Sequence, residues 1–339
     1  MFIAHGYDAW VAPANKVGLG YRVTREIAAA ALPSFLFLAG VGMAVRWLRT
    51  PATEHTVARR SLALRGLRLI AAGYALSLGY AALDGGLEQP AIWLRSDVLH
   101  AIGASMLVVV VLLFSARPGA SNVEPGQHRS GDARWPILGA ILLSFAIVML
   151  WPPLRVYWSG ARGVLGYALA PFLPVDGITR FAAVPLAVFC CLGFAFKLYC
   201  DTATVGRRFW ASFALVGLGT ALVGWSAVHV SLDDSAAAAN FVLRMNVLDG
   251  AGRAVVVLAL GGLLPARVQP PFALLGRHSL LLYAVHIPFC YGRFGKPLRS
   301  RLDLAQATFA MAALIAAALL LAAVLEAYSK RRAVQRSGR

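Results

Sequence analysis

The stretch IAAAALPSFLFLAGVGMAVRWL, residues 27–48, decides the fold class of this chain. A helix needs about 20 mostly apolar residues to cross a bilayer, and this stretch has that length with no charged residue before Arg46. It therefore predicts a membrane-spanning helix. Pro33 in its first half predicts a kink or a turn. Gly40 and Gly42 predict the close approach of another helix.

Similar apolar runs recur along the chain. Hydrophobic residues make up 59% of its 339 residues, and its mean hydropathy is +0.68, whereas soluble domains are about 45–50% apolar. The runs lack the alternating pattern of a membrane barrel. We predict an all-α, polytopic transmembrane helical bundle of about nine spans. The spans are expected at 27–48, 62–83, 98–115, 136–151, 181–199, 209–231, 250–265, 272–291 and 304–328.

The net charge of +17 is distributed as membrane topology requires. Lys and Arg cluster beside span ends, which places those loops in the cytoplasm, and acids lie in the alternating loops. This pattern favours topogenic charge with some attraction to anionic lipids, and no nucleic-acid partner is expected. The basic residues are Arg46, Arg49, Arg59, Arg60, Arg65 and Arg68, then Arg117, Arg129 and Arg134, then Lys197, Arg207 and Arg208, and finally Lys330, Arg331, Arg332, Arg336 and Arg339. The acids are Asp84, Glu88, Asp176, Asp233 and Asp234.

This charge pattern orients a single integral-membrane domain, residues 1–339. The C-terminus with its basic tail, 329–339, is predicted inside. An odd number of spans then places residues 1–26 outside, where we expect them to follow a first helix that the sequence lacks. Residues 117–134 are the one linker-like stretch. The four cysteines show neither a disulfide framework nor metal-ligand spacing, so no metal site is predicted.

One basic loop does not fit the predicted orientation. Arg293, Lys296, Arg299 and Arg301 fall on the predicted outer side. Either the topology differs locally, or these cations face lipid headgroups or an anionic substrate.

His5 and Asp8 form the first candidate site. Ionisable groups at membrane depth are costly, so each is a functional candidate. A neutral imidazole can take a proton from a hydroxyl or amine. Asp8 lies three residues later, on the same face of a continuing helix, and could hold the tautomer of His5. The alternative is a solvated, inert pair at a helix end.

Asp97 and His100 repeat this spacing at the start of a span. Together with His5 and Asp8 they could converge on one outward cavity, although Asp97 equally suits the first turn of a helix. His286 lies deep in its span, two residues before Pro288. It could bind substrate, or it could satisfy a backbone carbonyl that Pro288 leaves unpaired.

Several motifs resemble those of a known family. Thr24-Arg25 followed by Leu32-Pro33-Ser34-Phe35-Leu36-Phe37-Leu38-Ala39-Gly40 is similar to the second-helix motif of bacterial heparan-alpha-glucosaminide N-acetyltransferase catalytic-like membrane proteins. Residues 1–5, MFIAH, resemble the end of that family's first helix. Residues 97–103, 181–193 and 275–286 resemble further spans of this family or of the wider membrane acyltransferase superfamily. Leu186 and His100 depart from the family, which has Trp and an aromatic residue at these positions.

The resemblance implies a bacterial inner-membrane enzyme. It would move an acyl group, with acetyl favoured, from cytoplasmic acyl-CoA to a sugar or related acceptor on the far side of the membrane. His5 would be the catalytic base and Asp8 would orient it. Acceptor hydroxyls would meet Arg25, Asp97, His100 and His286, and the phosphates of acyl-CoA would meet Arg59, Arg60, Arg65 and Arg68. No bound cofactor is implied beyond acyl-CoA as co-substrate. Because the first helix is absent from this sequence, the resemblance is compatible both with an active enzyme and with a chain that is inactive as it stands.

Two other functions fit the same composition. The intramembrane histidines could relay protons in a transporter or flippase, although two matching halves with broken helices do not stand out. The chain could also be a non-catalytic membrane subunit. A homo-oligomer is compatible with each of these functions.

Overall fold

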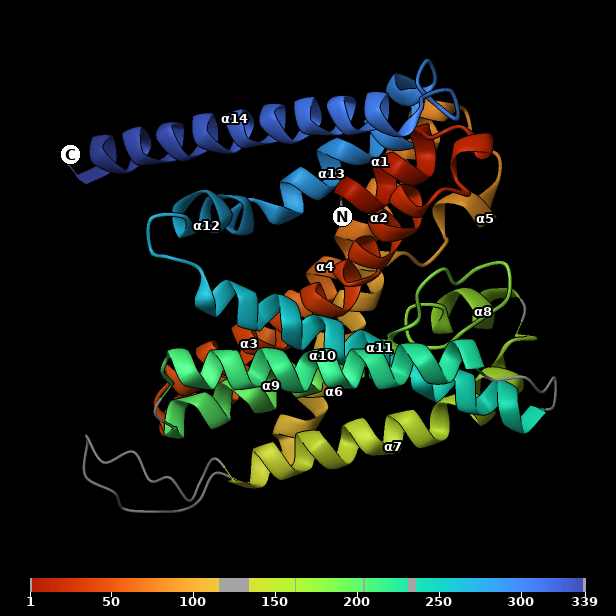
Figure 1. The fold of residues 1–339 in the computed structure, drawn as a ribbon. Helices are drawn as coiled ribbons and strands as arrows, with labels where there is room; N and C mark the ends of the chain where they lie inside the picture. The colour runs from red at the N-terminus through yellow and green to blue at the C-terminus, as the bar shows by residue number, and fades with distance from the viewer. Residues whose placement is uncertain (1, 116–133, 162, 204, 231–235, 338–339) are drawn as a thin grey trace. The chain divides into compact units, whose positions relative to one another are not determined.

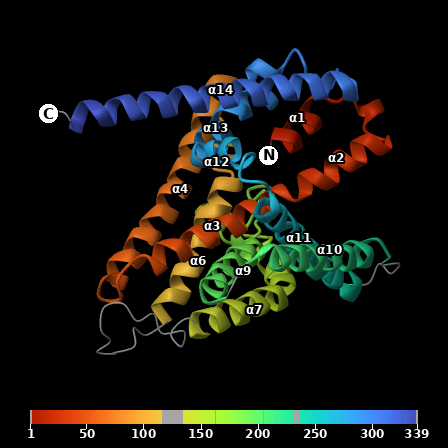
Figure 2. The same ribbon diagram turned by 60° about the vertical axis from the view of Figure 1, so that its left-hand side comes forward.

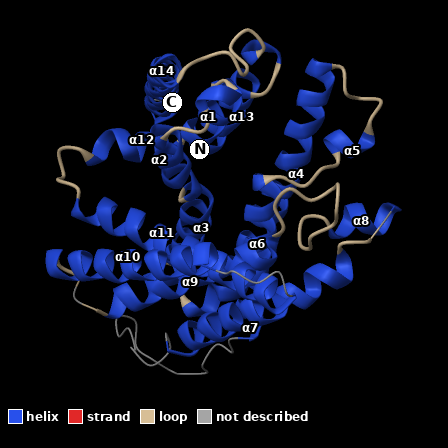
Figure 3. Ribbon diagram, turned by 45° about the vertical axis from the view of Figure 1, so that its right-hand side comes forward, coloured by secondary structure: helices blue, strands red, loops and turns tan. Residues whose placement is uncertain are grey.

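The computed structural model describes residues 2–115, 134–161, 163–203, 205–230 and 236–337. Within these ranges the regular structure consists of helices, without strands (Figure 3), which confirms the predicted all-α fold. The predicted linker, apart from Arg134, lies outside the described residues, as do Asp233, Asp234 and Arg339. The chain divides into two compact units, Met1–Ala31 with Leu263–Arg339 and Leu32–Gly262, and each is described by itself. That these form one functional domain stays a prediction.

The first unit combines helices from both ends of the sequence. Helix α1 packs against α2, α13 and α14, and α12 packs against α13 and α14 (Figure 1). The elements are α1 (Phe2–Trp10), η1 (Pro13–Asn15), α2 (Leu19–Ala29), α12 (Gln269–Arg277), α13 (Ser279–Cys290), η3 (Arg293–Gly295) and α14 (Leu304–Ser337).

Backbone hydrogen bonds attach the end of α1 to the segment that precedes α14. The amides of Arg301 and Leu302 donate to the carbonyl of Trp10 at 3.0 and 2.9 Å, and the amide of Ala12 donates to the carbonyl of Leu302 at 2.9 Å. The last carbonyls of a helix lack partners within it, so these bonds replace water. The indole of Trp10 also donates to the carbonyl of Phe289 in α13, at 3.2 Å. Helix α1 is therefore held by two neighbouring segments.

The second unit is built around α6 and α9. Helix α6 packs against α4 and α9, and α9 packs against α7. Figure 2 shows α4 and α6 side by side, with the chain running in opposite directions. Its elements are α3 (Ala31–Leu48), η2 (Ala52–Glu54), α4 (His55–Asp84), α5 (Pro90–Trp93), α6 (Val98–Ser115), α7 (Arg134–Trp158), α8 (Gly163–Leu169), α9 (Ala183–Thr202), α10 (Arg207–Val230) and α11 (Ala236–Leu263).

Glycines bring the helices of the second unit into backbone contact. A Cβ added to Gly66 in α4 would lie 2.8 Å from the carbonyl oxygen of Gly103 in α6. A Cβ on Gly40 in α3 would overlap the carbonyl of Cys190 in α9. The predicted close approach is confirmed at Gly40. It is wrong at Gly42, where no described atom lies within 4 Å of the added Cβ.

Seven helices within the described residues are long and apolar enough to cross a membrane. They are Leu19–Leu48, which includes α2 and α3, His55–Asp84, Arg134–Trp158, Ala183–Thr202, Arg207–His229, Ala238–Leu263 and Leu304–Ser329. The two other predicted spans coincide with shorter apolar helices, Val98–Phe114 and Ser279–Cys290. The polytopic helical architecture is thus confirmed, while nine spans and their orientation stay predictions.

Several helix ends differ from the predicted runs. Helix α4 begins at His55 instead of residue 62, and α11 begins at Ala236 instead of residue 250, because good helix formers such as Arg and Ala continue a helix beyond its apolar part. The predicted run 272–291 is interrupted at His278. The interruption at Ala30, between α2 and α3, lies close to Pro33, where a kink or turn was predicted.

The contact between Gly66 and Gly103 gives a direct test of this packing. Gly66→Ala should lower the free energy of unfolding by about 1–3 kcal/mol, because the added methyl forces α4 and α6 apart. The measurement is thermal or denaturant unfolding of the purified protein in detergent. Gly79→Ala is the matched control, since Gly79 lies in the same helix with no described atom within 4 Å of an added Cβ. Equal stability of the two variants would contradict the close contact.

Candidate active site

The two candidate residues of α1 meet at a tyrosine from the other end of the sequence. The hydroxyl of Tyr291, the residue that follows α13, donates to Oδ2 of Asp8 at 2.8 Å. The same hydroxyl lies 3.2 Å from Nδ1 of His5, and the rings of His5 and Tyr291 meet edge to face with their centroids 5.3 Å apart. Asp8 and His5 are therefore joined through a phenol.

The direction of these hydrogen bonds fixes the proton on His5. A phenol has a single hydrogen to donate, and that of Tyr291 is directed to Asp8. The contact between Tyr291 and His5 must then use a hydrogen on Nδ1 of the imidazole. In neutral His5 the basic nitrogen is consequently Nε2, the nitrogen that a general base would use.

His286 lies beside His5 in the same unit. Their ring centroids are 5.2 Å apart, and His286 is 1% exposed. Its Nδ1 lies 3.0 Å from the carbonyl oxygen of Leu282, which can only accept, so Nδ1 carries the hydrogen. Nε2 is buried and has no hydrogen-bond partner among the described residues. A buried acceptor of this kind is rare enough in native proteins to require an explanation.

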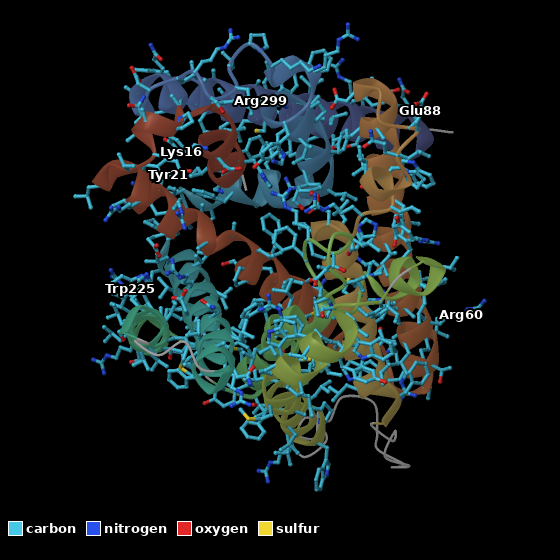
Figure 4. The ribbon with its side chains drawn as sticks, turned by 90° about the vertical axis from the view of Figure 1, so that its right-hand side faces the viewer. Lys16, Tyr21, Arg60, Glu88, Trp225 and Arg299 are labelled. Carbon is cyan, nitrogen blue, oxygen red and sulfur yellow. The ribbon has the colours of Figure 1, made fainter. Side chains whose placement is uncertain are left out.

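Both apolar and charged groups surround the two histidines. The ring of Phe2 lies 4.5 Å from that of His286. Lys16 faces Asp8, with Nζ 3.9 Å from Oδ1 and 2.6 Å from the backbone carbonyl oxygen. Its Nζ also lies 5.9 Å from the ring centroid of Tyr21, and both residues are labelled in Figure 4. Lys16 thus pairs with the carboxylate of Asp8, and the four residues His5, Asp8, His286 and Tyr291 are called the histidine cluster below.

Asp97 and His100 belong to the second unit, where they cap a helix. Oδ1 of Asp97 accepts the amide of Val98 at 2.8 Å, and Nδ1 of His100 accepts the amide of Asp97 at 3.0 Å. The bond from Asp97 to His100 is one half of a capping box, with His in place of the usual Glu or Gln at the third helical position, while the side chain of Asp97 binds the first amide of the helix. The cap accounts for the spacing of the pair, so substrate binding by these residues stays a prediction.

The ring of His100 is enclosed by α4. It is fully buried, and its centroid lies 4.1 Å from that of Tyr74. Gly73 leaves room for it, because an added Cβ there would lie 2.6 Å from Cε1 of His100. Convergence of this pair with His5 and Asp8 on one cavity stays a prediction.

The four arginines proposed for acyl-CoA divide into two groups on α4. Arg59 is 8% exposed, and its guanidinium carbon lies 5.6 Å from the ring centroid of Trp47 and 5.5 Å from that of Phe114. Such contacts are cation–π interactions that hold Arg59 in the packing. The exposed members are Arg60, Arg65 and Arg68, and Arg60 points away from the ribbon in Figure 4.

Two further points complete the set of candidates. Arg25 is exposed on α2. Among the described residues, no group of three or more His, Cys, Asp or Glu side chains could hold a metal. Tyr291 is the residue of the cluster that sequence reasoning missed; its position at the end of the helix that carries His286 was the available signal.

A comparison with protein families found a match to one segment in the N-terminal half of the chain. The model for heparan-alpha-glucosaminide N-acetyltransferase, catalytic, matches residues 12–123. The chain resembles this acetyltransferase family. The predicted resemblance is thereby confirmed over the matched segment. Neither curated proteins nor solved structures gave a significant match.

The matched segment contains only part of the candidate site. It includes Arg25, the four arginines of α4 and the Asp97–His100 pair, whereas His5, Asp8, His286 and Tyr291 lie outside it. The family match therefore supports a membrane acetyltransferase. For the residues of the histidine cluster, which lie outside the matched segment, support for a role comes from the geometry of their contacts.

The cap at α6 can be tested separately from the chemistry. Asp97→Ala should lower the free energy of unfolding by about 1 kcal/mol, the usual cost of losing an N-cap. Asp97→Ser should cost less, because the serine hydroxyl can still accept an amide. Chemical unfolding in detergent measures both variants. An equal loss from Ala and Ser would show that charge, and not capping, explains the residue.

Proposed function

We propose that this protein is a membrane acetyltransferase that uses acetyl-CoA from the cytoplasm and acetylates an amino sugar on the other side of the membrane. The family match at residues 12–123 supports acetyl transfer as the class of reaction. Seven candidate spans within the described residues agree with a membrane location. The heparan-alpha-glucosaminide in the family's description supports a terminal glucosamine as the acceptor, with an amine as the attacking group.

In the proposed reaction His5 is the general base. Nε2 of His5 takes a proton from the acceptor amine while the nitrogen of that amine attacks the thioester carbonyl carbon of acetyl-CoA. The carbon–sulfur bond breaks, and the leaving thiolate of CoA takes the proton that His5 has gained, which returns His5 to its basic form. The products are the N-acetylated sugar and CoA. A thioester is already activated, so positioning and one base are sufficient chemistry for the protein to supply.

His286 is proposed to bind the acceptor next to His5. Its Nε2 is a buried hydrogen-bond acceptor without a described partner, and an amine or hydroxyl of the sugar would supply the missing hydrogen. Contacts of the acceptor with Arg25, Asp97 and His100 remain predictions.

The exposed arginines of α4 are proposed to bind the phosphates of acetyl-CoA. Arginine forms strong, charge-assisted hydrogen bonds with phosphate. Arg59 already contacts Trp47 and Phe114, so we assign the phosphate contact to Arg60, Arg65 and Arg68.

The proposed base is tested by His5→Asn. The full chain is reconstituted in proteoliposomes with acetyl-CoA on one side and a glucosamine-terminated disaccharide on the other. Loss of the base should lower kcat by about 10²–10⁴-fold, without changing the midpoint of thermal unfolding. The control is His229→Gln, because His229 is an exposed histidine of α10.

Two outcomes would contradict the proposed function. Full activity of His5→Asn would exclude His5 as the base. Gradient-driven movement of the sugar across the membrane without consumption of acetyl-CoA would establish the transporter instead.

The phosphate contact is tested by replacing Arg60, Arg65 and Arg68 together with Gln. The KM for acetyl-CoA should rise about tenfold or more, as expected when charge-assisted bonds are lost, with the KM for the sugar unchanged. Steady-state kinetics at low ionic strength measures both constants. Arg207→Gln with Arg208→Gln is the control, since both side chains are exposed at the start of α10. An equal effect of both sets would exclude a specific phosphate site on α4.

A further inference from the structure

The hydroxyl of Tyr291 has no role in the reaction as written above. It nevertheless connects the only two ionisable side chains that α1 contributes to the histidine cluster within the described residues, His5 and Asp8. We propose that Tyr291 is a positioning residue, which transmits the orienting effect of Asp8 to His5 and keeps Nε2 as the basic nitrogen of the imidazole. This inference rests on the proposed function, because it assigns the support of the proposed base.

The bridge connects the two side chains because both carboxylate oxygens of Asp8 face groups other than the imidazole of His5. Oδ2 of Asp8 accepts the hydroxyl of Tyr291 at 2.8 Å, and Oδ1 faces Lys16 at 3.9 Å. A phenol can accept and donate at the same time. The hydroxyl oxygen of Tyr291 can therefore accept a hydrogen bond from Nδ1 of His5 while the hydroxyl hydrogen is donated to Asp8.

Tyr291 is itself held from both sides of its backbone. Its amide donates to the carbonyl of Ile287 at 2.8 Å, which continues the helical pattern of α13. Its carbonyl accepts a hydrogen bond from the guanidinium of Arg299. These bonds restrict the backbone from which the phenol extends, and the bonds to His5 and Asp8 then place its hydroxyl against α1.

A bridged imidazole is also chemically useful. An unrestrained neutral histidine exchanges its hydrogen between Nδ1 and Nε2, and the hydrogen bond to one nitrogen determines which form is present. When the base gains a proton, the nearby carboxylate stabilises the resulting cation through the polarised phenol. Asp8 and Tyr291 together stabilise the protonated form of His5 more than its neutral form. They therefore lower the free energy of the transition state, in which His5 gains the proton, more than that of the bound substrate.

The experiment compares Tyr291→Phe with Tyr7→Phe in the same proteoliposome assay. Both substitutions remove one phenolic hydroxyl from a hydrogen bond in the first unit; that of Tyr7 bonds to Oγ1 of Thr308 at 2.8 Å. Tyr291→Phe should lower kcat by about 10- to 100-fold and leave the KM values for acetyl-CoA and sugar within about twofold. Tyr7→Phe should leave kcat unchanged. The thermal midpoints of both variants are measured to separate loss of structure from loss of rate.

A double variant tests whether Asp8 acts through Tyr291. Asp8→Asn alone should lower kcat by a similar factor, and Asp8→Asn with Tyr291→Phe should lower it no further than the more severe single variant, because residues that act as a unit are not additive. Multiplication of the two single effects would overturn the bridge.

The assay separates this inference from the proposed function. If His5→Asn keeps the wild-type rate, the proposed function falls and Tyr291 has no base to position. If His5→Asn is inactive while Tyr291→Phe matches Tyr7→Phe in kcat, the proposed function stands and the bridge is wrong.

Discussion

The backbone bonds between the end of α1 and residues 300–302 position the candidate chemistry. Helix α1 has nine residues, fewer than an isolated helix needs to be stable in water. Its last carbonyls are instead paired with amides of the segment before α14, and Trp10 joins it to α13. The position of His5 next to Tyr291 and His286 therefore depends on contacts between the two ends of the sequence. Local helix propensity alone would not provide it.

The sequence predicted what short-range rules determine. Apolar length located the spans, since about 20 apolar residues can cover the bilayer only as a helix. The spacing of three residues between Asp97 and His100 correctly made them neighbours, but capping and ligand binding use the same spacing, and only the hydrogen bonds of Val98 and Asp97 reveal the cap. Arg59 similarly belongs to a basic cluster in sequence and to an aromatic contact in structure.

The bridge through Tyr291 could not be predicted, although the residue lies at the end of the helix that carries His286, because its partners are distant in sequence. Its hydroxyl contacts Asp8 and His5, which precede it by 283 and 286 positions in the chain. No periodicity within a helix encodes contacts over such a separation. The same limit applies to His5 and His286, which were separate candidates in the sequence and lie side by side in the first unit. Intramembrane polarity identified the participants, whereas the packing of α1 against α13 determined the arrangement.

The proximity of two imidazoles limits how many protons the cluster can hold. Both histidines use Nδ1 as a donor, His5 toward Tyr291 and His286 toward the carbonyl of Leu282, so each leaves Nε2 as a base. Two imidazolium ions with ring centroids 5.2 Å apart would repel by about 3 kcal/mol at an effective dielectric constant of about 20. Asp8 reaches His5 through Tyr291, while His286 has an apolar ring, Phe2, against it. Simultaneous protonation of both histidines is therefore unfavourable, and of the two rings it is that of His5 that Tyr291 connects to the carboxylate.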